Sequence, residues 1–153
     1  MKQPSARDCF VCGAANPFGL QLAFYNSEPG QVTAEYTVPA HYQGYPGVVH
    51  GGVVAAMLDE AAGRAHMTGE TPRFMYTARL EVRYRKNVPI NQPLHLVGHT
   101  GKNKGRTATA SSEIYDSQGT LLAEAQAVLV DIPDHVIDSA DLEEIGWKIY
   151  PDG

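Results

Sequence analysis

The stretch of residues 47–66 constrains the fold of this chain more than any other. It reads Gly-Val-Val-His-Gly-Gly-Val-Val-Ala-Ala-Met-Leu-Asp-Glu-Ala-Ala-Gly-Arg-Ala-His. From Val53 onward the pattern predicts one helix that is apolar almost all the way round. A helix without a polar face belongs in a core or against a partner, because its apolar surface is unfavourable in water. We therefore expect the rest of the chain to wrap around this helix.

The start of the predicted helix carries none of the usual capping residues. His50, Gly51 and Gly52 stand where a Ser, Thr, Asp or Asn would accept hydrogen bonds from the first backbone N–H groups. These donors lie at the positive end of the helix dipole. The sequence therefore predicts free N–H groups that can hold an anion or a polarised carbonyl oxygen.

Two adjacent carboxylates on this helix have different surroundings. Glu60 precedes Arg64 by four residues, which is the favourable order for a helical ion pair. Asp59 has only small apolar residues as helical neighbours, and a charge in such surroundings is costly to bury without a partner. Two interpretations of Asp59 stay open: a structural acid hydrogen-bonded to another strand or subunit, or a catalytic acid.

The spacing of Gly51 and Asp59 restricts how they can act together. Eight residues of helix separate the two by about 12 Å. A carbonyl held at the Gly51 N–H must lie within about 3.5 Å of the group that attacks it. Asp59 therefore cannot serve the site that Gly51 of the same chain builds. If both act, two antiparallel helices related by a twofold axis share the site, and the protein is a dimer or larger.

Alternating apolar residues predict strands on both sides of the helix. A hairpin of residues 18–25 and 31–38 precedes it, and strands 74–87, 94–100, 107–115 and 121–132 follow; a short helix is expected near 139–145. The predicted fold class is α+β, one long helix wrapped by a curved antiparallel sheet of about six strands. We divide the chain into an irregular lead-in (1–17), one domain (18–132) and an acidic extension (133–153).

Thr77 does not fit the simple alternation of its strand. The pattern places it on the side of Arg79, opposite Ala78 and Leu80. Either the strand carries a bulge near its start, or Thr77 faces a dimer seam, or it is an ordinary strand threonine.

Composition and charge exclude several function classes. The chain has 153 residues, a net charge of −5 and a pI of about 5.6, which argues against a nucleic-acid binder. Seven of its 12 basic residues nevertheless fall between Arg79 and Arg106, with Glu81 as the only acid there. This cluster suits a phosphorylated ligand or is a solvated strand face. No apolar stretch approaches ~20 residues and no signal-peptide core is present, so we expect a cytoplasmic protein without a membrane partner.

Cys9 and Cys12 form a single C-x-x-C pair near the N-terminus. The pair provides half of a zinc site, which a second subunit or a histidine would have to complete. Thioredoxin-type chemistry would require the pair to open a helix after a strand, whereas residues 13–17 predict a turn. We favour two reduced structural thiols, and expect neither a metal nor a cofactor.

The order of elements, the Gly-Val-Val-His-Gly-Gly of residues 47–52 and the Asp nine residues after His50 resemble the hotdog-fold acyl-CoA thioesterases of the PaaI type. The opening Cys-Phe-Val-Cys-Gly of residues 9–13 and the Asn-Pro-Phe-Gly-Leu of residues 16–20 resemble a subgroup of them. The similarity covers roughly residues 9–132. It implies a homodimer with one continuous sheet and two antiparallel helices, with a tetramer of two dimers left open.

The resemblance also implies roles for individual residues. The Gly51 N–H would polarise the thioester carbonyl, and Asp59 of the other chain would act as nucleophile or as general base on water. Thr77 would orient the acid or the water, and His50 would shape the turn before the helix. Many members carry an Asn or Gln about six residues before the His; here Gly44 has that spacing, and Gln43 is the substitute.

Acyl-CoA is the substrate that the resemblance implies. The substrate-binding candidates are Gly52 at the helix start and the basic residues Arg83, Arg85, Lys86, Lys102, Lys104 and Arg106 for the phosphates. The acyl group stays open, although Tyr42, Tyr45, Phe74 and Tyr76 could line its pocket or belong to the core, and a carrier protein could replace coenzyme A. Alternatives are a hotdog protein that binds acyl-CoA without hydrolysis, a dehydratase, which would need His and Asp together at the helix start, and a purely structural dimer.

Overall fold

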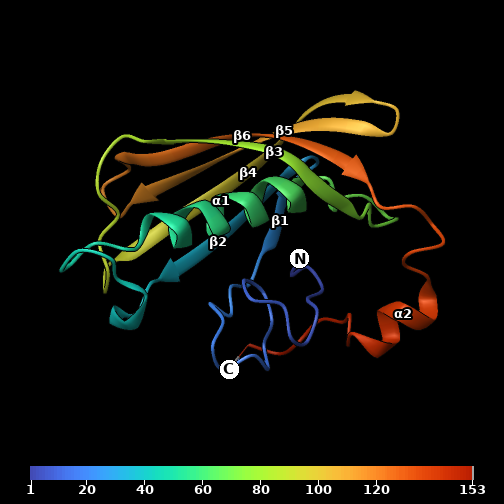
Figure 1. Ribbon diagram of the computed structural model, residues 1–153, viewed down its shortest axis with the longest axis horizontal. Helices are drawn as coiled ribbons and strands as arrows, with labels where there is room; N and C mark the ends of the chain where they lie inside the picture. The colour runs from blue at the N-terminus through green and yellow to red at the C-terminus, as the bar shows by residue number, and fades with distance from the viewer. Residues whose placement is uncertain (153) are drawn as a thin grey trace.

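The computed structural model describes residues 1–152 and consists of a sheet curved around one long helix (Figure 1). In chain order the elements are β1 (Tyr25–Glu28), β2 (Gln31–Thr37), the 3-10 turn η1 (Ala40–Tyr42), α1 (Gly51–Ala65), β3 (Met75–Tyr84), β4 (Pro93–Lys104), β5 (Thr107–Asp116), β6 (Leu121–Asp131) and α2 (Ser139–Glu144). The expected α+β hotdog architecture is confirmed.

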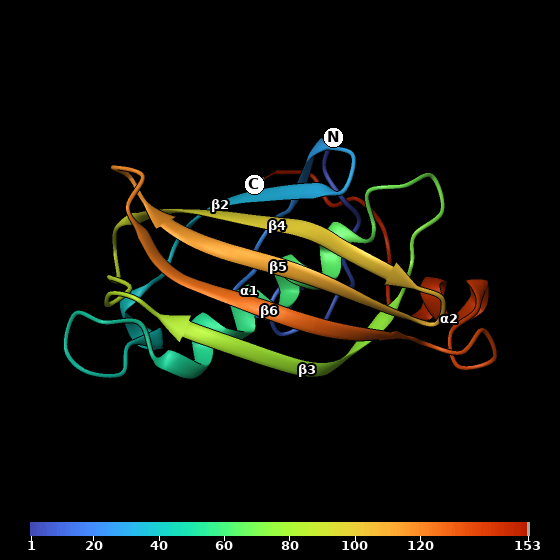
Figure 2. The same ribbon diagram turned by 90° about the horizontal axis from the view of Figure 1, so that it is seen from above.

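All six strands form one antiparallel sheet in the order β1-β2-β4-β5-β6-β3. Figure 2 shows β3 along one edge of this sheet and β2 toward the other. The strand that follows α1 in sequence, β3, is therefore an edge strand, with one row of backbone N–H and C=O groups that no strand within residues 1–152 pairs.

The face of α1 that meets the sheet provides the centre of the core. Val54, Met57, Leu58, Ala61 and Ala65 are at most 1% exposed. They pack against apolar side chains from several strands of the sheet and from the N-terminal segment, among them Leu22, Phe24, Leu94, Leu96, Ile114 and Ala123. Burying these side chains supplies about 25 cal/mol for each Å² removed from water, which fixes the helix on the sheet.

Gly98 of β4 lets the helix lie directly on the sheet. A Cβ atom at Gly98 would stand 2.1 Å from the carbonyl oxygen of Ala61 in α1. Nearby, the Ser112 hydroxyl of β5 donates a hydrogen bond of 2.7 Å to the carbonyl oxygen of Leu58. Helix backbone and sheet backbone are thus in contact here, without a side chain between them.

The strand expected at residues 18–25 is wrong, since only Tyr25–Glu28 pairs as a strand. Its alternating residues are buried as expected, but Gln21 has a φ of 56°, which a regular strand does not allow. The N–H groups of Leu20 and Leu22 donate instead to the carbonyls of Phe10 and Val11. Burial beneath the helix, not sheet pairing, produces the alternation.

Of the alternatives left open for Thr77, the structure shows the bulge near the start of β3. Thr77 pairs with Leu129 and Arg79 pairs with the adjacent Val128, so Ala78 is one extra residue in β3. A bulge re-aims the side chains before it. Thr77 accordingly points toward α1, although plain alternation assigns it to the other face.

The two terminal segments pack on each other below the helix (Figure 1). The Ser5 N–H donates to the carbonyl of Lys148, and the Lys2 ammonium lies 2.6 Å from the Asp152 carboxylate. Gly153, the last residue of the predicted acidic extension, lies outside the described residues. Among the helices that the structure describes, none is long and apolar enough to cross a membrane.

Replacing Gly98 by alanine tests the contact between helix and sheet. We expect Gly98→Ala to lower the free energy of unfolding by about 2 kcal/mol or more, since overpacking usually costs ~1–3 kcal/mol and the neighbour here is rigid backbone. Urea unfolding measures the effect. Gly69→Ala is the control, because a Cβ there meets nothing closer than 3.9 Å. Equal stability of both variants would contradict the contact.

Candidate active site

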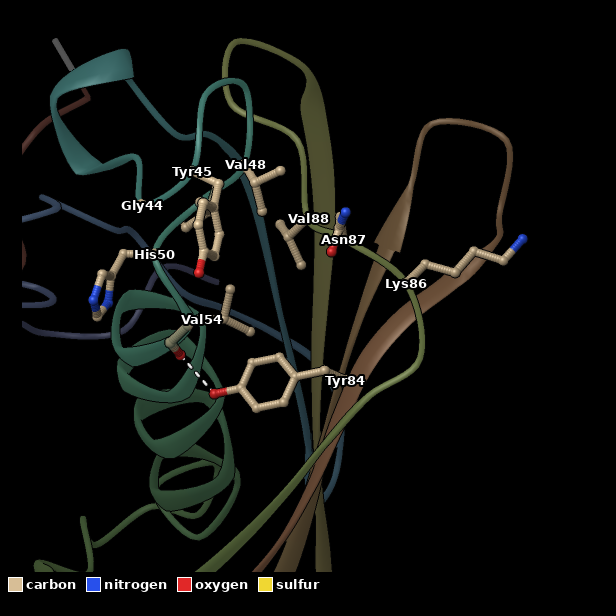
Figure 3. Close-up of a pocket in the computed structure, with 11 residues that line it drawn as sticks. Gly44, Tyr45, Val48, His50, Val54, Tyr84, Lys86, Asn87 and Val88 are labelled. Atoms are coloured by element: carbon tan, nitrogen blue, oxygen red, sulfur yellow. Dashed lines mark hydrogen bonds between the residues drawn. The ribbon is translucent and has the colours of Figure 1, made fainter.

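A cavity of about 510 Å³ opens at the N-terminal end of α1 (Figure 3). It is lined by the loop before the helix, by the first helical turn and by the end of β3 with the residues after it: Gly44, Tyr45, Val48, Val49, His50, Gly51, Val54, Tyr84, Lys86, Asn87 and Val88. Its lining is mostly apolar with a few polar groups, as is typical of small-molecule sites.

The prediction that the helix start has no side-chain cap is wrong. The His50 ring accepts a hydrogen bond of 2.9 Å at Nδ1 from the Gly52 N–H. An imidazole nitrogen two residues before the donor takes the place of the oxygen of a capping Ser or Asp. Gly52, a predicted substrate-binding residue, therefore has its N–H engaged by His50.

The Gly51 N–H differs from its neighbour. Within residues 1–152 no group accepts a hydrogen bond from it. Its peptide plane is nonetheless fixed, because the His50 carbonyl accepts from the N–H groups of Val53 at 2.9 Å and Val54 at 3.1 Å. The donor is therefore oriented before any ligand arrives, which is the condition for effective stabilisation of a developing oxyanion.

Tyr84 links the edge strand to the first residue of the helix. Its hydroxyl donates a hydrogen bond of 2.6 Å to the Gly51 carbonyl oxygen (Figure 3). The sequence pattern did not indicate Tyr84 as a site residue. No local pattern could have revealed it, because its partner is 33 residues away in the chain.

Asp59 and Thr77 meet at a second, smaller cavity. The Thr77 hydroxyl donates a hydrogen bond of 2.6 Å to Asp59 Oδ1. Burial raises the pKa of Asp59 above its ordinary value, and the charge of Glu60 adds to this, whereas the bond from Thr77 opposes it. A carboxylate with this pKa accepts a proton more readily than an exposed one.

Gly51 and Asp59 belong to different cavities of the same chain. The one beside Asp59 has about 100 Å³ and contains Thr77 but not Gly51; the larger one contains Gly51 but not Asp59. With about 12 Å of helix between them, the two groups cannot reach one small substrate atom from the same chain.

The other predicted site residues take varied positions. The Gln43 side-chain oxygen accepts from the Gly47 N–H at 3.2 Å, and the residue braces the loop without lining the larger cavity. In Figure 3 the His50 ring lies on the far side of the helix start from Tyr84, and Lys86 extends away from the loop. The aromatic Tyr45 lines the cavity and is 85% exposed.

The structure divides six of the seven residues of the predicted basic cluster into two groups, and Arg79 lies between them on β3. Arg83, Arg85 and Lys86 lie at or just beyond the Tyr84 end of β3, and Arg85 is 3.3 Å from Glu124. Lys102, Lys104 and Arg106 lie at the β4–β5 hairpin, level with the Met75 end of β3. Counted along β6, from the partner of Arg83 to the partner of Arg106, these two levels are seven residues or about 23 Å apart. One chain thus presents two basic regions instead of one patch.

A further group of donors lies between α1 and the N-terminal segment. Cys9, Cys12 and Glu60 place one donor atom each within 4.8 Å of one another, and they are the one such group of His, Cys, Asp and Glu found among residues 1–152. A hydrogen bond from the Cys12 thiol lowers the pKa of Cys9 to about 6, although burial opposes the shift. These residues are the candidates for a metal in this chain.

Comparison with known proteins agrees with this arrangement. The sequence pattern of the thioesterase superfamily matches residues 46–123, about half of the chain. Acyl-coenzyme A thioesterase THEM4 of Rattus norvegicus is 29% identical over 133 residues, which make up 86% of this chain and 56% of that protein. The chain thus spans little more than half the length of this relative.

Solved structures show the same fold. Protein RHA08564, a thioesterase superfamily protein, has a TM-score of 0.74 and 31% identity, covering 81% of this chain and 63% of that one. A hypothetical thioesterase protein from Streptococcus pneumoniae TIGR4, solved with coenzyme A, has a TM-score of 0.65 and 17% identity, covering 71% and 84%. At that identity the second likeness shows the fold alone.

A six-stranded antiparallel sheet around one helix, with His-Gly-Gly at the helix start, defines a hotdog-fold protein. The chain belongs to the thioesterase superfamily.

The raised pKa of Asp59 predicts a pH-dependent stability. The folded state binds the Asp59 proton more tightly than the unfolded chain does, so this stabilising contribution is complete below the ordinary aspartate pKa and is lost as the pH rises through the raised one. We expect Asp59→Asn to be more stable than the wild type at pH 7, with the difference shrinking toward about pH 4.

Urea unfolding at both pH values measures this, with the exposed Asp134→Asn as the matched control, which should change stability by less than about 0.5 kcal/mol. A loss of stability in Asp59→Asn at pH 7 would instead identify Asp59 as a structural acid.

Proposed function

We propose that this protein is an acyl-CoA thioesterase, which hydrolyses an acyl-CoA thioester to the free acid and coenzyme A. The Gly51 N–H carries the proposal: it is unpaired within residues 1–152, held in a fixed orientation, and placed at the positive end of α1 beside a cavity of about 510 Å³. A preorganised donor of this kind stabilises the oxyanion formed during thioester cleavage by about 3 to 4 kcal/mol.

The acid for this reaction comes from a second copy of the chain. Asp59 lies too far from Gly51 of its own chain, and β3 is an edge strand of ten residues whose Tyr76 and Tyr84 are more than half exposed. Pairing β3 with β3 of a second chain in antiparallel order extends the sheet and satisfies the unpaired edge. The Tyr84 end of one β3 then lies beside the Met75 end of the other.

This pairing also reunites the residues that a single chain separates. Gly51, Tyr84 and Lys86 of one subunit come to the side on which the other presents Asp59 and Thr77. The two basic groups, Arg83 with Arg85 and Lys104 with Arg106, converge in the same way. Together they suit the phosphates of coenzyme A, because a phosphate is bound by clustered cations.

Asp59 acts as nucleophile or as general base on water, and Thr77 orients it through the 2.6 Å hydrogen bond. His50 holds the turn by capping Gly52, and Gln43 braces the preceding loop. Because Asp59 must be ionised to act, the acid limb of the pH–rate profile should lie above the ordinary aspartate range.

The relatives support this substrate. The rat relative is an acyl-coenzyme A thioesterase, and the Streptococcus pneumoniae structure holds coenzyme A. We place this protein in the PaaI-like subgroup, in the cytoplasm, as a homodimer that can associate further into a tetramer. The alternative is a hotdog protein that binds acyl-CoA without hydrolysing it. Asp59 argues against this alternative, because a protein that only binds acyl-CoA has no need of a partly buried acid with a raised pKa.

The Gly51 N–H can be deleted without changing the helix. We expect Gly51→Pro to lower kcat for acyl-CoA hydrolysis by about 10²–10³-fold, because proline lacks only this donor and is favoured at the first helical position. His50 has a φ of −54° and a ψ of 134°, which a following proline allows. Gly51→Ala, which keeps the donor and meets Tyr84 only at 3.6 Å, is the control. Activity is measured as the release of free thiol. Equal activity of the two variants would contradict the oxyanion role of the Gly51 N–H.

Mixing two inactive variants tests the shared site. Gly51→Pro and Asp59→Asn should each lose at least about 100-fold in activity. When equal amounts are unfolded and refolded together, half of the dimers are mixed, and each has one intact site, so about a quarter of wild-type activity should return. Mixtures that stay inactive while mixed dimers form would show that both residues act within one chain.

A further inference from the structure

Cys9 and Cys12 play no part in the thioesterase mechanism, and Glu60, the third member of their cluster, enters it only through its charge beside Asp59. Their three donor atoms lie within 4.8 Å of one another. Cys12 is only 4% exposed, whereas the Glu60 side chain is 22% exposed and gives an ion a path from solvent. We propose that Cys9, Cys12 and Glu60 bind one thiophilic divalent cation, zinc being the ion that these donors fit, and that it ties the N-terminal segment to α1.

The backbone already holds the two thiols in the arrangement of a metal-binding turn. The Cys12 N–H donates to Cys9 Sγ at 3.4 Å, which favours negative charge on that sulfur. The Gly13 N–H donates to the Cys9 carbonyl at 2.9 Å, and a Cβ at Gly13 would lie 2.3 Å from that oxygen. Only glycine permits a turn this tight.

Two further bonds brace the turn from the side. The N–H groups of Leu20 and Leu22 donate to the carbonyls of Phe10 and Val11, the two residues between the cysteines, each at 2.8 Å. A turn that is ordered before the ion arrives loses little conformational freedom on binding. Zinc bound to sulfur at about 2.3 Å and to oxygen at about 2.0–2.2 Å requires the donors to close by only about 1 Å, and leaves a fourth position for water.

Arg64 balances the charge and orients Glu60. Its Nε lies 2.9 Å from Glu60 Oε1, and its Nη1 donates to the carbonyl of Pro4 at 2.6 Å and to Gln3 Oε1 at 3.3 Å. The guanidinium is thus held in place, 2% exposed, as the group that positions the carboxylate ligand. Two thiolates and Glu60 carry three negative charges, which a divalent cation and Arg64 cancel in full. A neutral cluster is far less costly to bury than one with a net charge.

The sequence alone offered half of a zinc site and no third ligand. Glu60 is 48 residues beyond Cys12, and its spacing to Arg64 predicts only an ion pair. Only the packing of the N-terminal segment against α1 brings it to the thiols.

Cobalt titration of the reduced, chelator-stripped wild-type protein tests the proposal without any mutation. Binding of one Co²⁺ per chain should produce the near-ultraviolet absorption of thiolate-to-cobalt charge transfer, and zinc should abolish it by displacement. Both Cys9→Ser and Cys12→Ser should weaken this band. Glu60→Gln should keep it but weaken the affinity, measured by competition with a chromophoric chelator, by at least about tenfold.

The matched control is Glu124→Gln, which removes a carboxylate paired with Arg85 but distant from the thiols and should leave cobalt affinity unchanged. The proposal fails if the wild type, with both thiols shown to be free, gives no charge-transfer band. It also fails if the band survives replacement of both cysteines. A Cys9–Cys12 disulfide that forms in air, in a protein whose reduced form binds no cobalt, would overturn it in favour of a redox pair.

Discussion

The contact between Gly98 and the Ala61 carbonyl determines how the rest of the molecule is arranged. Because β4 has no side chain at this point, α1 lies against the sheet backbone. The apolar face of α1 is then fully buried. This placement leaves the Gly51 N–H beside a cavity instead of beneath a strand.

The edge position of β3 has a second effect on the site. A helix that carries a donor at its start and an acid two turns later cannot bring them together by itself. An unpaired edge strand beside the helix can pair with the same strand of a second chain, and the twofold axis of that pairing can bring the donor of one chain to the acid of the other. The bulge at Ala78 belongs to the same arrangement, because it turns Thr77 toward Asp59 where regular alternation would turn it away. Strand order and one extra residue thus decide what the acid can reach.

Much of this fold could be predicted from periodicity, and the exceptions have physical causes. The helix and the four later strands followed from their apolar patterns. The strand predicted for residues 18–25 was wrong. Leu20, Leu22 and Phe24 alternate in burial as in a strand, but the N–H groups of Leu20 and Leu22 donate to the turn that carries the cysteines. The capping role of His50 was missed because histidine is an uncommon cap. Within the candidate site, motif spacing indicated Gly51 and Asp59, whereas Thr77 was a candidate only through the family resemblance.

Other contacts at the site could not be found this way. Tyr84 reaches the Gly51 carbonyl across 33 residues of chain, and Glu60 meets the thiols only through tertiary packing. Residues brought together by folding leave no local trace in a single sequence. The division of the basic residues between two ends of the sheet was hidden for the same reason, since they are close in sequence and separated by the length of a strand.

The burial of Arg64 makes the chain ends part of the domain. Its guanidinium lies over the rings of Phe24 and Trp147 and bonds to Gln3 and Pro4, so its partners come from both terminal segments as well as from α1. A truncated chain that starts at residue 18 would keep Arg64 and its ion pair with Glu60 but lose these oxygens, and leaving a buried donor unsatisfied costs about 1–3 kcal/mol. The smallest unit that folds well is therefore larger than residues 46–123, the segment that the thioesterase superfamily pattern matches.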